Sequence, residues 1–296
     1  MQSLDYLVNY AVFRQAFITG LAIAVVCSLL SVLVVFKRMA FIGQGISHAG
    51  FGGVGLAILV GVVATRAQDL LVLAFCVGTG VMIGVLSRRR QLETDTAIGI
   101  MLAGAMALGV LLADVSVMLQ EHAWYRRIFG LAEARPSFET LLFGSLTNVS
   151  AADMYTAIAL AAAVVLVMAL LAKEMIFFAF DETAARVSGV PTGMIYYLLL
   201  VLLSVAIVMS IRLVGIVLVS ALLVIPGATA ALLSQRLGQV IAASLAVGLI
   251  GTLGGLVLSL EVGHLSSGPC IVLVLCGIFA AVFAFRAALN RRGDIA

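Results

Sequence analysis

The chain has few charged residues, few prolines and no closely spaced cysteine pair. Only 10% of its 296 residues are charged, against about a quarter in an average soluble domain. Its 4 cysteines include no C-x-x-C pair, so buried thiols are favoured over a disulfide framework or a cysteine metal site. No Walker A, H-E-x-x-H or G-x-S-x-G motif is present, so the sequence shows no machinery of its own for hydrolysing nucleotides.

Long apolar runs are abundant, because 64% of the residues are hydrophobic. A helix needs about 20 such residues to cross a bilayer. The runs predict an all-α polytopic membrane protein, a single transmembrane domain over 1–296, with about nine spanning helices. With 29 glycines, these helices are expected to approach one another closely. The runs lie near 15–36, 41–64, 69–87, 96–118, 151–172, 194–211, 213–235, 239–260 and 269–289.

The polar segments between the runs alternate between many and few Lys and Arg residues, and this alternation predicts the orientation of the chain across the membrane. One set of breaks holds eleven of the 17 Lys and Arg residues and the other holds six. Because cytoplasmic loops carry the excess of Lys and Arg, the N-terminus is expected outside and the C-terminus in the cytoplasm. The larger set is Lys37, Arg38, Arg88, Arg89, Arg90, Lys173, Arg186, Arg236, Arg286, Arg291 and Arg292.

Two polar regions are too long to be simple turns. Residues 119–150 are expected to form a long outer connection that is partly helical at the membrane interface. Residues 173–193 are expected to be cytoplasmic. Within them FDETAARVSG begins with acidic residues and ends at Gly189, which is typical helix punctuation. It predicts a short helix over roughly 181–188.

One apolar run combines a row of small residues with a histidine. Positions four apart share a helix face, so a neighbouring helix is expected to pack closely on the row. Gln44 and His48 form the adjacent row. His48 is either a hydrogen-bonded core residue or a contact for a polar cargo, since imidazole is a common ligand for transition metals. The small-residue row is Gly45, Ala49, Gly53, Ala57 and Gly61.

Two further runs are predicted to contain irregularities in helix geometry. Pro226 and Gly227 lie inside the run 213–235, and Pro269 opens the last run. A proline within a span frees a backbone carbonyl, which protein or a water-lined cavity then satisfies. These residues are interpreted as helix breaks, either as simple kinks or as part of a pathway.

Five stretches in order along the chain resemble the permease subunits of zinc/manganese-type ABC importers. The third and fourth also resemble, more distantly, the permeases of vitamin B12 and siderophore importers. The resemblance spans nearly the whole chain. The stretches are FKRMAFIGQGISHAGFGGVGLA, LLFGSLTNVSAADM, FAFDETAARVSGVP, RLVGIVLVSALLVIPGATAALLS and SSGPCIVLV.

The resemblance implies a bacterial inner-membrane importer for zinc, manganese or iron ions. It implies a dimer, most simply a homodimer, with the pathway between two permease copies. It also implies separate ATPase subunits that bind ATP and Mg²⁺, and an extracytoplasmic metal-binding protein; no cofactor is expected on this chain. The positions that match the ATPase-coupling helix are Asp181, Glu182, Ala185, Arg186 and Gly189.

By the same resemblance, Gln44, Ser47 and His48 line the translocation pathway, and His48 is a transient metal ligand. Many relatives carry an acidic residue where this chain has Gln44. An amide oxygen and an imidazole nitrogen still suit a borderline cation, more weakly than a carboxylate would. A conduit must release what it binds, so a weak site is compatible with transport.

Two rival classes remain. A stand-alone secondary transporter or channel usually shows inverted halves with broken helices or buried coupling acids, and we find neither in the sequence. An intramembrane enzyme needs a nucleophile and a base that face each other, and the missing motifs argue against it.

Overall fold

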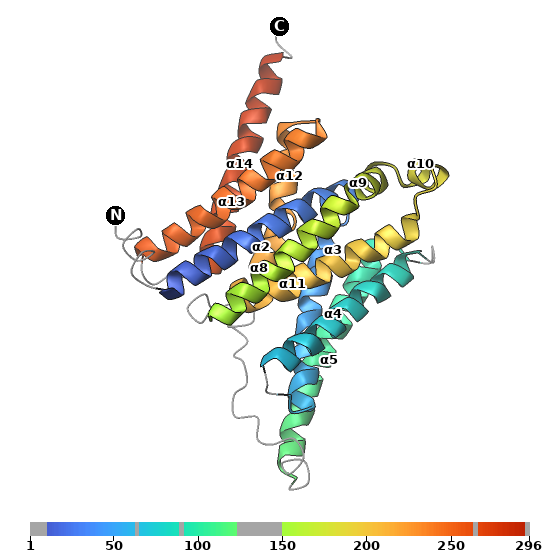
Figure 1. The fold of residues 1–296 in the computed structure, drawn as a ribbon, viewed down its shortest axis with the longest axis vertical. Helices are drawn as coiled ribbons and strands as arrows, with labels where there is room; N and C mark the ends of the chain where they lie inside the picture. The colour runs from blue at the N-terminus through green and yellow to red at the C-terminus, as the bar shows by residue number, and fades with distance from the viewer. Residues whose placement is uncertain (1–10, 63–64, 89–91, 123–149, 263–265, 294–296) are drawn as a thin grey trace.

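The computed structural model describes residues 11–62, 65–88, 92–122, 150–262 and 266–293, which form helices joined by turns, without strands (Figure 1). Across these residues, nine helical segments are long and apolar enough to cross a membrane, which confirms the predicted number. The helices are α2 (Ala11–Phe36), α3 (Ala40–Leu59), α4 (Thr65–Arg88), α5 (Thr94–Gln120), α8 (Ala151–Leu170), α9 (Ala172–Phe180), α10 (Glu182–Val187), α11 (Thr192–Leu222), α12 (Ile225–Leu233), α13 (Leu237–Val262) and α14 (Ser267–Gly293).

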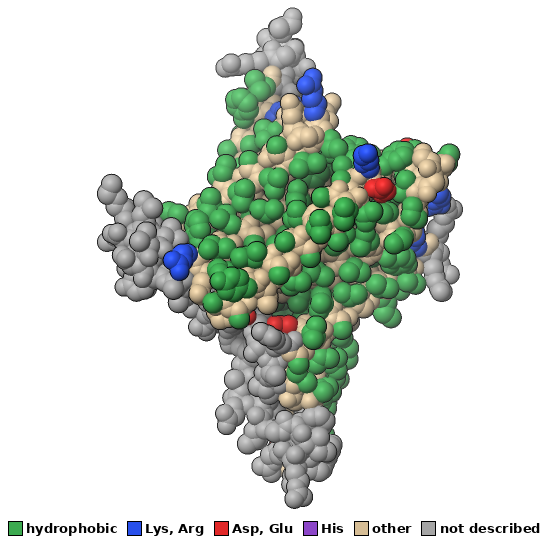
Figure 2. Space-filling view, viewed as in Figure 1, with side chains coloured by type: hydrophobic (Ala, Val, Ile, Leu, Met, Phe, Trp, Pro, Cys, Tyr) green, Lys and Arg blue, Asp and Glu red, His purple; other side chains and the backbone are tan. Residues whose placement is uncertain are grey.

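Helix α11 is the centre of the bundle. It packs against α2, α3, α4, α8 and α14, and its first half is buried through residues such as Leu199, Leu203 and Ile207. In Figure 1, α2, α8 and α11 run side by side, with α13 and α14 on one flank and α3 to α5 on the other. Figure 2 shows this face covered by hydrophobic side chains, with charged groups toward its margins. An apolar exterior of this kind matches a bilayer as solvent.

Helix α11 is broken at Gly215. The residue has φ 80° and ψ 163°, a conformation that only glycine adopts without strain. The chain breaks again at Leu223 and Val224, before α12 begins at Ile225. The run 213–235 is therefore two helical pieces rather than one continuous helix.

The prolines of the two irregular runs lie in first turns of helices. Pro226 is in the first turn of α12, where a missing backbone N–H costs nothing. The backbone N–H of Gly227 donates to Ser31 Oγ at 2.8 Å, so α12 lies directly on α2. Pro269 is the third residue of α14. The break in helical geometry therefore comes before Pro226. Helix α14 continues without a break after Pro269.

The small-residue row of α3 is shorter than predicted. Gly45, Ala49, Gly53 and Ala57 are buried in α3. Gly61 lies beyond the end of the helix at Leu59, with φ 67°, so it ends the helix instead of extending the row.

The expectation that all four cysteines are buried needs one correction. Cys27, Cys76 and Cys270 are buried, but Cys276 is exposed on α14.

Helices α3 and α5 cross with almost no space between their backbones. A Cβ atom built on Gly109 of α5 would lie 2.6 Å from the carbonyl oxygen of Phe51. Facing it on α3, a Cβ atom on Gly55 would collide with the Gly109 backbone. Close approach through small residues stabilises helix pairs in lipid, where the hydrophobic effect does not.

We expect Gly109→Ala to lower the free energy of unfolding by about 1–3 kcal/mol, because the added methyl group overpacks the crossing. Thermal unfolding of the purified protein in detergent measures it. Gly104→Ala, on the same helix, is the matched control, since a Cβ atom there meets nothing within 4 Å. Equal effects of the two substitutions would contradict the crossing described here.

Candidate functional site

Helix α3 has one face on α11 beside the Gly215 break. Gly43, Ser47 and Gly50 point to it: Cβ atoms on the two glycines would lie 3.0 Å from Leu223 Cδ1 and Ile211 Cδ1, respectively. Ser47 Oγ lies 3.4 Å from Ser220 Oγ and donates to the Gln44 carbonyl at 3.0 Å. Ser47 is fully buried. It therefore joins α3 to the broken part of α11.

A second face of α3 is not covered by the described part of the chain. Phe41 is 58% exposed, Gln44 is exposed and His48 is half-buried. The three residues are spaced by three and four, so they share one side of the helix. Of the three expected pathway residues, Gln44 and His48 lie on this open face, whereas Ser47 lies on the neighbouring one.

The His48 ring has an unsatisfied nitrogen. Its Nδ1 is buried and makes no hydrogen bond to any group that the structure describes. The ring lies against Phe51, with the ring centroids 6.0 Å apart. A buried polar atom without a partner is costly, and more so in a membrane span. Because the face is open, a partner from outside this chain can reach the imidazole.

The described part of a single copy does not assemble a metal site by itself. Within the described residues, no group of three or more His, Cys, Asp or Glu side chains is close enough to hold an ion. His48 and Gln44 supply one nitrogen and one oxygen, fewer than a bound transition metal takes. Any ion at this face needs further ligands from beyond the described residues of one chain, such as water or a second chain.

The predicted short helix is confirmed as α10. Asp181 is its N-cap and accepts the Ala184 N–H at 2.9 Å, as short polar side chains do at this position. Gly189 has φ 85° and follows the helix end, where a left-handed residue is common. Ala185 is buried beneath it.

One carboxylate attaches α10 to the rest of the bundle. Glu182 pairs with Lys37 at the end of α2 at 2.8 Å and with Arg88 at the end of α4 at 3.3 Å. Arg186, one turn along α10, is also 3.3 Å from it. Lys37 Nζ lies 3.7 Å above the Phe178 ring of α9, a cation–π contact. The ends of α2, α4 and α9 thus meet at α10.

The same contacts control the charge of Glu182. Partial burial raises the pKa of this carboxyl, but hydrogen bonds and charges from Lys37 and then Arg88 outweigh it and leave the pKa below its ordinary value. A lowered carboxyl pKa stabilises the fold above its unfolded-state value, and the benefit disappears as the pH falls through the folded-state value. Near neutral pH the carboxylate is therefore fully charged.

The outer side of α10 carries an apolar residue among polar neighbours. Val187 is 85% exposed, and Arg186 and Ser188 beside it are exposed as well. A single exposed apolar residue is ordinary. Here Val187 lies on a helix that ion pairs fix to the bundle. Helix α10 therefore exposes a small surface, with a fixed position, beyond the ends of α2 and α4.

A model of the ABC 3 transport family matches residues 9–286. The chain belongs to this family. It is 31% identical over 283 residues to the manganese transport system membrane protein MntC of Halalkalibacterium halodurans, covering 95% of this chain and 89% of that protein. Its structure matches PsaBC from Streptococcus pneumoniae, solved in complex with Fab, with a TM-score of 0.79 and 27% identity over 96% of this chain and 95% of that one. A metal-chelate type ABC transporter in an inward-facing conformation shares the fold, with a TM-score of 0.64 and 17% identity over 92% and 85% of the two chains.

Membership identifies the chain as a multi-pass membrane permease subunit of an ABC transport system, which is not itself the ATPase. The sequence predicted α10 but not the ion pairs of Glu182 that fix it to α2 and α4. Lys37 and Arg88, the partners of Glu182, both belong to the set of cations predicted on the cytoplasmic side. Their shared side of the membrane was the one sequence feature that could have indicated these ion pairs. The expected outer connection falls largely on 123–149, outside the described residues.

Proposed function

We propose that this chain is the membrane-spanning permease of an ATP-driven importer for a divalent transition metal ion, with Mn²⁺ as the first candidate. The observation that carries the proposal is the half-buried His48 ring on the open face of α3, whose buried Nδ1 has no hydrogen-bond partner among the described residues. The manganese-transport name of a 31% identical relative supports the choice of metal. Zn²⁺ and Fe²⁺ are the competitors, since imidazole nitrogen suits all three ions.

The pathway lies between two permease copies, most simply identical ones. In such a dimer the open faces of α3 meet, and each copy contributes a His48 and a Gln44. This arrangement supplies the ligands that one copy lacks. A ligand set of two imidazoles and two amide oxygens binds the ion weakly enough to release it.

Helix α10 couples the permease to a separate ATPase, which binds ATP and Mg²⁺. Val187 and its exposed neighbours contact the ATPase, and Glu182 transmits the movement to the ends of α2 and α4. This side of the membrane is then the cytoplasm. An extracytoplasmic metal-binding protein delivers the ion to the opposite side.

Affinity purification of the chain from native membranes tests this proposal, and we expect it to recover an ATPase. Uptake of radiolabelled Mn²⁺ into cells should stop when ATP is depleted and should persist when a protonophore collapses the proton gradient. The reverse pattern, or a lone homodimer that transports Mn²⁺ after reconstitution, would show a secondary transporter and overturn the proposal.

A further inference from the structure

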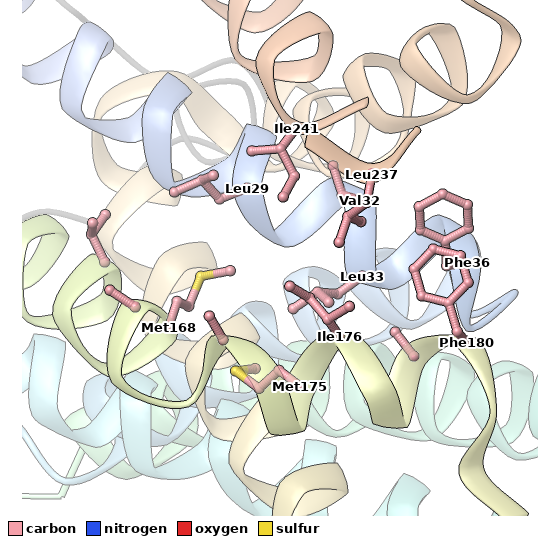
Figure 3. Close-up of a pocket in the computed structure, with 14 residues that line it drawn as sticks. Leu29, Val32, Leu33, Phe36, Met168, Met175, Ile176, Phe180, Leu237 and Ile241 are labelled. Carbon is pink, nitrogen blue, oxygen red and sulfur yellow. The ribbon is translucent and has the colours of Figure 1, made fainter. Parts of the chain in front are cut away.

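An apolar groove lies on the membrane face of the bundle, away from the pathway residues. Its floor is α2, which contributes Leu29, Val32, Leu33 and Phe36, and its walls are α8–α9 and α13 (Figure 3). The cavity volume is ≈ 190 Å³. An apolar cavity of about 150 Å³ is enough to stay dry and hold a benzene molecule. The groove therefore has room for an apolar ligand.

The groove opens to the surroundings of the protein. Ala169 and Phe180 on its rim are exposed, and Leu166 and Leu170 beside it are 60% and 72% exposed. Phe36 and Phe180 close one end, with ring centroids 4.7 Å apart. In Figure 3 the labelled side chains of α2, α13 and α8–α9 point into a common space. Among the side chains that Figure 2 colours by type, no histidine is visible on this face.

Two cations lie on the rims of the groove. Lys173 is exposed and lies one turn before the lining residue Ile176, and Arg236 is exposed directly before the lining residue Leu237. The structure gives neither side chain an ion pair with a described residue. One cation belongs to the helices of each wall, next to lining residues in the sequence, so both walls offer positive charge for an anionic group.

The dimensions fit one acyl chain. The lining residues of α8–α9 run from Val165 to Phe180, about 22 Å at 1.5 Å per residue, and Lys173 is near the middle of this stretch. From Lys173 to the lining residue Val165 the helices advance about 12 Å. One leaflet of the hydrocarbon core is about 15 Å thick. A chain that enters beside Lys173 and runs toward Val165 and Leu29 therefore stays within one leaflet.

From these observations we propose that the groove binds an anionic membrane phospholipid. One acyl chain fills the space between α2, α8–α9 and α13, and the phosphate lies between Lys173 and Arg236. The bound lipid contacts both α2 and α9, whose ends meet at α10. Its presence or absence in the groove therefore changes how tightly α9 packs on α2. The inference does not depend on which metal is carried.

Native mass spectrometry of the full assembled protein tests the site, with phosphatidylglycerol and phosphatidylethanolamine offered in equal amounts after a detergent wash. We expect wild type to retain phospholipid and to prefer phosphatidylglycerol about tenfold, since each cation near a surface attracts an anionic lipid by about 1 kcal/mol before screening. Ala172→Phe should remove the retained lipid. Lys173→Gln combined with Arg236→Gln should keep lipid bound and lose the preference.

Two variants serve as matched controls. Ala163→Phe adds the same ring to an exposed position of α8 outside the groove, and Arg14→Gln removes an exposed cation at the other end of α2. Both should behave as wild type. Equal lipid retention in Ala172→Phe and Ala163→Phe would overturn the proposal. So would a loss of dimer in Ala172→Phe with unchanged lipid, because a second copy would then cover the groove.

Discussion

Replacing His48 by alanine is expected to lower the initial rate of Mn²⁺ uptake at least about tenfold, with little change in the amount of protein in the membrane. Loss of groups that only orient a metal ligand already costs about 10–100-fold in affinity or activity. His48 is the group that we place against the ion itself. Its Nδ1 has no partner in the described chain, so its removal breaks no internal hydrogen bond. Radiolabelled Mn²⁺, Zn²⁺ and Fe²⁺ uptake by intact cells measures the effect and ranks the metals.

The matched control is His122→Ala. His122 is exposed just past the end of α5, with Nδ1 3.3 Å from the Met118 carbonyl oxygen, and its loss should leave uptake unchanged. Gln44→Glu is a second variant that places a carboxylate one turn from the imidazole. It should lower the KM for Mn²⁺ and also the maximal rate, because tighter binding slows release. Wild-type uptake of all three metals by His48→Ala would show that the pathway lies elsewhere.

Replacing Glu182 by alanine is expected to uncouple ATP hydrolysis from transport. The substitution removes the carboxylate that joins α10 to Lys37 of α2 and Arg88 of α4, and leaves Lys37, whose side chain is only 14% exposed, without its anion. An unpaired and largely buried charge is unfavourable, so α10 should move independently of the helix ends. In reconstituted vesicles, metal moved per ATP hydrolysed should fall roughly tenfold while ATP hydrolysis continues.

Glu174→Ala on α9 is the control, because it removes the same charge from a residue that has no ion pair among those the structure describes. Glu182→Asp keeps the charge on a shorter side chain and should recover part of the coupling. A Glu182→Ala protein with the wild-type ratio of metal to ATP would refute the role given to this carboxylate. Loss of complex assembly would instead place Glu182 in docking.

Much of the membrane fold was predictable from local properties of the sequence. Apolar runs of spanning length predicted the number of helices, and α10 was predicted from the acidic residues at its start and the glycine after its end. The row from Gly45 to Ala57 identified a packing face of α3. In the run 213–235 a break near Pro226 was predicted and lies just before it, whereas the break at Gly215 was not predicted, because hydropathy does not register a glycine with positive φ.

By itself, then, the sequence determined which segments cross the membrane, where α10 begins and ends, and that Gln44 and His48 share one side of α3. These properties depend on residues a few positions apart, and helix geometry relates such residues without knowledge of the fold. Only the tertiary structure decided that Glu182 meets Lys37, 145 residues away, and Arg88, 94 residues away. It also decided that α3 leaves one face open and that α2, α8–α9 and α13 enclose a groove. Such contacts depend on which helices cross and at what depth, and neither follows from the periodicity of a single helix.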